Sequence, residues 1–114
     1  MRKLFTIALL AGTLALTACA GQMAPLVKDV SDLEGDTIDL RNGQVLDIVT
    51  GDEYVESYTG TVSDPSIAEF TQGKDDGSAI FNPGITALAP GTTKVVLSSD
   101  EEGLEDVTFE VHVD

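Results

Sequence analysis

The chain has 114 residues and is strongly acidic, with 20 Asp and Glu against 6 Lys and Arg and a formal net charge of −14. Binding to phosphates requires a basic face, so this balance excludes nucleic acid as a partner. The chain has a single cysteine, so an intrachain disulfide cannot stabilise the core, and it has no tryptophan to pack there.

The first residues have the pattern of an export signal. Arg2 and Lys3 provide positive charge, and residues 4–16 are almost wholly apolar. This run is shorter than the roughly 20 apolar residues that a spanning helix needs. We therefore expect residues 1–18 to form a cleaved signal-peptide helix that ends just before Cys19.

The end of this segment resembles the lipobox of bacterial lipoprotein signals, which Leu16, Thr17, Ala18 and Cys19 match at all four positions. The resemblance implies that the Cys19 sulfur receives a diacylglycerol with acyl chains of the palmitate type. After cleavage Cys19 becomes the new N-terminus. The protein would then be anchored to the cell membrane or outer membrane by this N-terminal lipid and face the periplasm or the exterior. The alternative is an ordinary cleaved signal with an incidental cysteine.

Residues 19–35 show no strong periodicity, and we expect them to form a flexible tether. Val27, Val30 and Leu33 recur at three-residue spacing, which is a weak signal for a helical turn. The domain predicted from the sequence covers residues 36–114.

Residues 36–114 have the alternation and turn residues of an all-β domain. Asn42-Gly43 predicts a tight turn, and Pro83-Gly84 and Pro90-Gly91 predict type II turns. The clearest strand is the last, where apolar and polar residues alternate. The expected strands cover residues 37–40, 45–49, 54–62, 66–70, 78–81, 85–88, 92–98 and 107–113.

Short strands at regular spacing predict an immunoglobulin-like antiparallel β-sandwich of about seven strands. Ser63–Ala68 and Gly84–Val95 resemble the corresponding motifs of the bacterial immunoglobulin-like domain family, group 2. The resemblance implies a non-catalytic binding, adhesion or structural module of the cell envelope, with an unknown protein or glycan ligand. The family's usual tryptophan is missing, so Tyr58 or Val62 must fill its space.

A second resemblance is to the chagasin-like inhibitors of cysteine proteases, which share this sandwich type and a similar late strand. Such inhibitors insert three loops into a protease cleft. Their Asn-Pro-Thr-Thr-Gly and Arg-Pro-Trp loops are absent here, and Asn82-Pro83-Gly84 matches the first of these motifs only in part. An inhibitor of cysteine proteases is therefore the alternative function, with no inhibitory residue carried over.

The sequence offers no catalytic or cofactor motif, so we expect neither an enzyme nor a bound cofactor. His112 is the only histidine, and alternation places it on the exposed face of the last strand. Carboxylates in the expected loops are weak candidates for a calcium site, because calcium prefers six to eight oxygen ligands. Solvated loop tips are the more common reading of such residues. The candidates are Asp52, Glu53, Asp75, Asp76, Asp100, Glu101 and Glu102, with Glu105 and Asp106 nearby.

Overall fold

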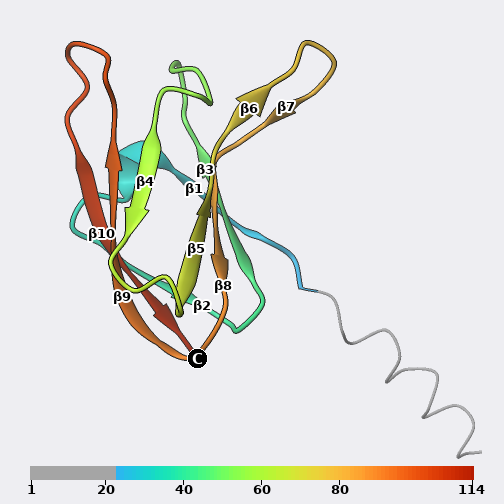
Figure 1. Cartoon of the computed structure of the whole chain (residues 1–114), viewed down its shortest axis with the longest axis vertical. Coiled ribbons are helices and arrows are strands. Elements are labelled where there is room, and N and C mark those ends of the chain that lie inside the picture. Colours follow the sequence, from blue (N-terminus) through green and yellow to red (C-terminus); the bar gives the residue numbers. More distant parts are fainter. Residues whose placement is uncertain (1–22) are drawn as a thin grey trace, which may run out of the picture.

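The computed structural model describes residues 23–114 (Figure 1). The predicted signal peptide, lipobox and Cys19 lie outside the described residues. Within residues 23–114 no helix is long and apolar enough to cross a membrane.

The predicted all-β sandwich is confirmed: two four-stranded sheets pack face to face, and a two-stranded ribbon extends from them (Figure 1). The first sheet contains β1 (Leu26–Asp29), β3 (Val45–Val49), β8 (Gly84–Ala87) and β5 (Ala68–Thr71), in that order. The second contains β2 (Thr37–Leu40), β10 (Val107–Val113), β9 (Gly91–Ser98) and β4 (Thr59–Val62). The ribbon pairs β6 (Lys74–Asp75) with β7 (Ile80–Phe81).

The core lies between the sheets and is almost entirely aliphatic, because every second residue of each strand faces inward. Leu46 and Ile48 of β3 are fully buried, as are Val95 and Leu97 of β9. Phe109 of β10 is the largest fully buried side chain. Each such side chain stabilises the fold by about 1.5–3 kcal/mol relative to exposure.

The last two strands form the longest ladder. β10 pairs antiparallel with β9 from Val107–Leu97 to Val113–Gly91. Burial alternates along β10 from Phe109 to Val113, which confirms the predicted alternation. The sheets are not wholly antiparallel, however, because β1 runs parallel to β3 and β2 runs parallel to β10. These two strands are close in sequence but belong to different sheets.

The predicted tether is wrong for its second half, which belongs to the sandwich. β1 adds an edge strand to the first sheet, and a 3₁₀ turn, η2 (Val30–Asp32), follows it. Leu33 is 0% exposed and joins the core. The folded domain therefore begins before residue 36, because an edge strand and two apolar side chains pack against distant residues.

The expected strand over 54–62 is also shorter than predicted. Residues 54–57 form a turn in which the Ser57 amide donates to the Tyr54 carbonyl at 3.0 Å, and only β4 is extended. Tyr54 is exposed whereas Tyr58 is buried, so the two rings do not share a face.

Of the turns expected from sequence, the one at Asn42-Gly43 is present: the Gln44 amide donates to the Arg41 carbonyl at 2.9 Å, and Gly43 has a φ of +91°. This turn carries the chain from the second sheet to the first. The type II turn expected at Pro83-Gly84 is wrong, because Gly84 lies in β8 and does not have a positive φ.

Gly60 of β4 allows the open edges of the two sheets to approach. The Phe70 ring of β5 lies directly over it, so a Cβ atom at position 60 would be 2.3 Å from Phe70 Cδ1. The glycine therefore marks a close approach of one strand to another.

We predict that Gly60→Ala destabilises the domain by about 1–3 kcal/mol, as overpacking does. Without this contact, replacing glycine by alanine in a strand would stabilise the domain by roughly 0.5–1 kcal/mol. The sign of the change in the free energy of unfolding therefore shows whether the contact is present. Urea unfolding measures it, and Phe70→Leu in the same chain should restore part of the loss. A Gly60→Ala variant as stable as the parent would contradict this packing.

Candidate functional site

The three longest connections of the sandwich meet at one of its ends, which we call the three-loop end (Figure 1). Residues 50–58 connect β3 to β4, residues 72–83 connect β5 to β8 and contain the ribbon, and residues 99–106 connect β9 to β10. The short turns at residues 41–44, 63–67 and 88–90 lie at the opposite end. This follows from the strand directions. β3 and β5 are both antiparallel to β8, so they end at the same end of the sandwich. β9 is antiparallel to β4, so β9 ends where β4 begins, after residues 50–58.

Residues 50–58 form two successive turns on a buried base. The Thr50 hydroxyl, which is buried, donates to the Glu53 carbonyl at 2.9 Å. At the other end of the loop Tyr58 enters the core. Burial raises the pKa of the Tyr58 hydroxyl, and the negative charges of Glu53 and Glu101 raise it further. The loop therefore has fixed ends and an exposed middle.

Residues 72–83 pack against the first loop through a glycine. A Cβ atom on Gly73 would lie 2.1 Å from the Val55 carbonyl oxygen, so only glycine permits this approach of the two backbones. Beside it the Gln72 amide nitrogen donates to the Tyr58 carbonyl at 2.7 Å. These contacts fix the base of the ribbon relative to residues 50–58.

The tip of the ribbon is closed by Asp76. Its carboxylate accepts hydrogen bonds from the Ser78 amide at 3.0 Å, the Ser78 hydroxyl at 2.9 Å and the Ala79 amide at 2.9 Å. These donors, with the two backbone amides as the larger causes, lower the pKa of Asp76 below its ordinary value of 3.8. Asp75 also accepts a hydrogen bond from the Gly77 amide at 3.0 Å, so two carboxylates order the tip and Asp76 makes most of the contacts.

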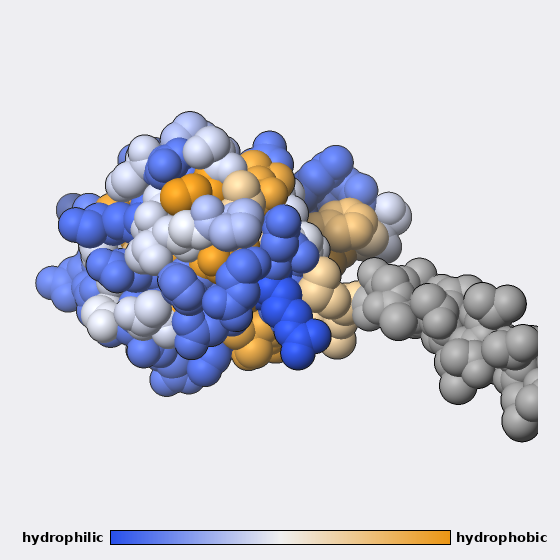
Figure 2. All heavy atoms as spheres, turned by 90° about the horizontal axis from the view of Figure 1, so that it is seen from below, coloured by the Kyte–Doolittle hydropathy of each residue, from blue (hydrophilic) through white to orange (hydrophobic). Residues whose placement is uncertain are grey.

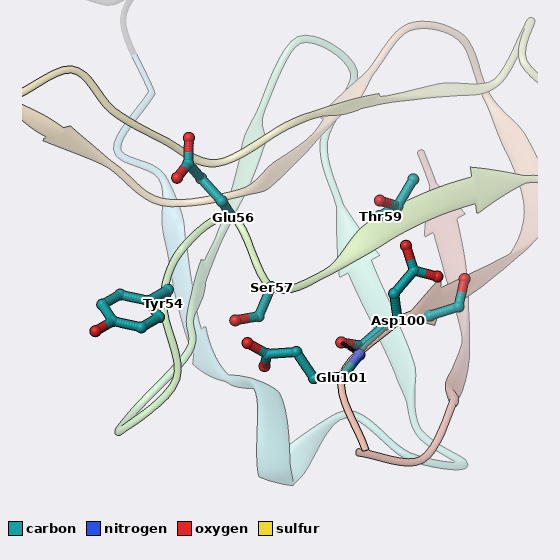
Figure 3. Close-up of a pocket in the computed structure, with 8 residues that line it drawn as sticks. Tyr54, Glu56, Ser57, Thr59, Asp100 and Glu101 are labelled. Carbon is teal, nitrogen blue, oxygen red and sulfur yellow. Dashed lines mark hydrogen bonds between the residues drawn. The ribbon is translucent and has the colours of Figure 1, made fainter. Parts of the chain in front are cut away.

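A hollow of about 350 Å³ separates residues 50–58 from the end of β9 and the loop that follows it. In Figure 3 the Ser57 and Glu101 side chains extend in the same direction from the two segments that border this hollow, and Tyr54 points away from both. Ser57 Oγ is buried and has no hydrogen-bond partner among the described residues. A second hollow of about 390 Å³ lies between the first loop and the ribbon, lined by Tyr54, Val55 and Ile80 among others.

Large apolar side chains are exposed at this end of the molecule. Tyr54 is 78% exposed on the first loop, and Ile80 and Phe81 are 67% and 54% exposed on the ribbon. Tyr54 and Ile80 line the same hollow, and Phe81 follows Ile80 on the ribbon. Exposed apolar side chains that share a region mark interaction sites, and tyrosine is enriched in the cores of protein interfaces. Sequence reasoning missed these residues, because it assigned all three to strands.

The same loops contain all of the carboxylates that are weak calcium candidates in the sequence. They hold Asp52, Glu53, Glu56, Asp75, Asp76, Asp100, Glu101, Glu102, Glu105 and Asp106, against one basic residue, Lys74. Within residues 23–114, no three Asp, Glu, His or Cys side chains are grouped so that they could hold a metal ion. The loops bring these carboxylates to one end without converging them, so within residues 23–114 the weak calcium candidates are not assembled into a site.

His112 lies far from the three loops, near the C-terminal end of β10. It is exposed, as alternation predicts, and its Nδ1 lies 2.9 Å from Thr92 Oγ1. Its Nε2 lies 3.3 Å from an oxygen of Asp114. The histidine belongs to the opposite end of the sandwich and takes no part in the candidate site.

No family model matches the chain, and no curated protein sequence matches it. Solved structures match most of it, and three of them are as follows. The cysteine protease inhibitor EhICP2 from Entamoeba histolytica is 17% identical, with a TM-score of 0.53 over 83% of this chain and 100% of that one. Amebosin is 18% identical, with a TM-score of 0.51 over 81% of this chain and 100% of that one. Domains 4 and 5 of the S-layer protein SbsC are 20% identical, with a TM-score of 0.43 over 72% and 42% of the two chains. At these identities the likeness to EhICP2 and amebosin shows a shared immunoglobulin-like sandwich fold and nothing beyond the fold.

We predict that the tip of the ribbon loosens only in strong acid. A carboxyl with a lowered pKa stabilises the folded tip above the unfolded pKa, and this contribution is lost as the pH falls through the folded pKa, below 3.8. An NMR titration should show the Asp76 carboxyl and the Ser78 and Ala79 amides changing together below that pH. In Ser78→Ala the midpoint should rise part of the way back, and a parent midpoint at or above 3.8 would contradict the arrangement.

Proposed function

We propose that this protein is a non-catalytic binding module that inhibits cysteine proteases with its three-loop end. The observation that carries the proposal is the meeting of three loops, distant in sequence, at one end of the sandwich with apolar side chains at their surface. Chagasin-like inhibitors insert three loops into a protease cleft, and the fold likeness to EhICP2 extends over the full length of that inhibitor. Both facts support the same assignment.

In this proposal Tyr54, Ile80 and Phe81 make the principal contacts with the protease. A few large side chains carry most of the binding free energy in protein interfaces, and aromatic residues are prominent among them. The chain lacks the Asn-Pro-Thr-Thr-Gly and Arg-Pro-Trp loops of chagasin-like inhibitors. Recognition would therefore depend on the side chains that this chain presents at the same end of the fold.

The charge of the three-loop end indicates which proteases it would bind. The three loops that carry the apolar contacts also contain ten carboxylates and one ammonium group. Complementary charge accelerates association, and like charge disfavours the wrong partner. We expect the preferred proteases to be basic around the active-site cleft, with association that slows as salt screens the attraction.

We further propose that the protein acts at a membrane surface, held by a lipid on Cys19. The support is the lipobox pattern of Leu16, Thr17, Ala18 and Cys19 after an apolar segment. An inhibitor anchored in this way would protect the envelope from proteases that arrive from outside.

Inhibition of papain tests the principal proposal. Tyr54→Ser and Ile80→Ser should each weaken inhibition by about 30-fold, the consequence of losing about 2 kcal/mol of binding free energy. Leu88→Ser is the matched control, because Leu88 is 43% exposed at the opposite end, and it should inhibit like the parent. Absence of inhibition by the parent at micromolar concentration would overturn the proposal and favour an adhesion or structural module.

Fractionation of expressing cells tests the anchor. The parent should be recovered with membranes, and Cys19→Ser should be recovered in the soluble fraction, because no thiol remains to carry a lipid. A parent whose intact mass shows an unmodified Cys19 would contradict lipidation without bearing on inhibition.

A further inference from the structure

The structure assigns an orientation to the anchored protein: we propose that the end opposite the three loops faces the bilayer and that the three-loop end points away from it. This inference rests on the proposed anchor at Cys19. It determines which surface a protein partner can reach and which surface lies against lipid.

The direction of β1 carries the argument. β1 runs parallel to β3, with Leu26 beside Leu46 and Asp29 beside Val49. β3 ends at the first of the three loops, so β1 begins at the other end of the sandwich. An antiparallel edge strand would have placed the beginning of the chain among the loops.

The residues just before β1 are fixed at that opposite end. The Gln44 side-chain amide donates to the Ala24 carbonyl at 3.1 Å. Met23 packs on the same turn, since a Cβ atom on Gly43 would lie 3.3 Å from Met23 Cε. Downstream of β1, Val30 and Leu33 are buried in the core and hold the strand in place.

The distance from the anchor to these fixed residues is short. Four residue steps separate Cys19 from Met23, which allow at most about 14 Å of extended chain. The strands of the sandwich are of similar or greater length, since the five residues of β3 span roughly 17 Å. A chain this short keeps the beginning of β1 beside the bilayer, and the loops then lie at least a strand length farther out.

The distribution of charge favours the same orientation. Ten carboxylates lie in the three loops, whereas the opposite end has two side-chain carboxylates, Asp64 and Asp114, and one guanidinium, Arg41. Anionic lipids repel the first group far more strongly than the second. Figure 2, viewed from below, shows this opposite end as a mainly hydrophilic surface with scattered hydrophobic residues. Such a surface is compatible with lipid headgroups and does not require insertion into the bilayer.

Tryptophan fluorescence tests the orientation, because the chain contains no tryptophan of its own. Asn42→Trp places a single fluorophore in the turn at the anchored end, and Tyr54→Trp places one at the three-loop end. Each full-length variant is reconstituted into phosphatidylcholine vesicles that carry spin-labelled lipid. Protein purified without a lipid on Cys19 is instead coupled through the Cys19 thiol to a maleimide lipid. Natively lipidated and chemically coupled protein are then both anchored at the Cys19 sulfur.

We expect the spin label to quench Asn42→Trp several-fold more strongly than Tyr54→Trp. The same tryptophans in a Cys19→Ser background, which lacks the anchor, should be quenched little and equally. Equal quenching of the two anchored variants, or stronger quenching of Tyr54→Trp, would overturn the orientation. The measurement uses no protease, so a failure of inhibition would overturn the proposed function and leave this result intact.

Discussion

The burial of aliphatic side chains between two four-stranded sheets is the interaction on which the rest of this structure depends. Residues 23–114 contain no cysteine, and the core contains few aromatic rings, chiefly Phe109 and Tyr58. The aliphatic side chains that alternation directs inward must therefore supply nearly all of the stabilisation. Their burial fixes the lengths and directions of the strands. The connections at the ends of the sheets bear less of this constraint. Three of them are long, polar and acidic, and the strand directions place all three at one end.

The elements that the sequence predicts correctly are those set by neighbouring residues in the chain. Alternation in residues 107–113 predicted β10, and Asn42-Gly43 predicted a turn that is present. The errors arose where the outcome depends on distant partners. Residues 26–33 were expected to form a tether, because a short edge strand and two apolar side chains are ordered only by the residues against which they pack. The sheet to which each strand belongs is likewise decided by pairing across the whole chain, as the parallel pairs show.

The candidate site was only partly predictable for the same reason. The sequence identified the loop carboxylates, but the spacing of residues 50–58, 72–83 and 99–106 contains no sign that these segments meet. Their contact depends on details such as the absence of a side chain at Gly73, which lets the ribbon base approach Val55. The exposure of Tyr54, Ile80 and Phe81 was hidden for a related reason: apolar residues in a short β-like segment are expected to be buried, and only the fold shows that they are not.

The central claim is that the three-loop end is the surface by which this protein binds its partner. Hydrogen–deuterium exchange of the protein with and without papain tests it most directly, because it reports every segment of the backbone at once. Our account predicts slower exchange on binding in residues 50–58, 72–83 and 99–106, and unchanged exchange in the turns at residues 41–44, 63–67 and 88–90. Protection confined to those short turns or to the outer faces of the sheets would contradict it.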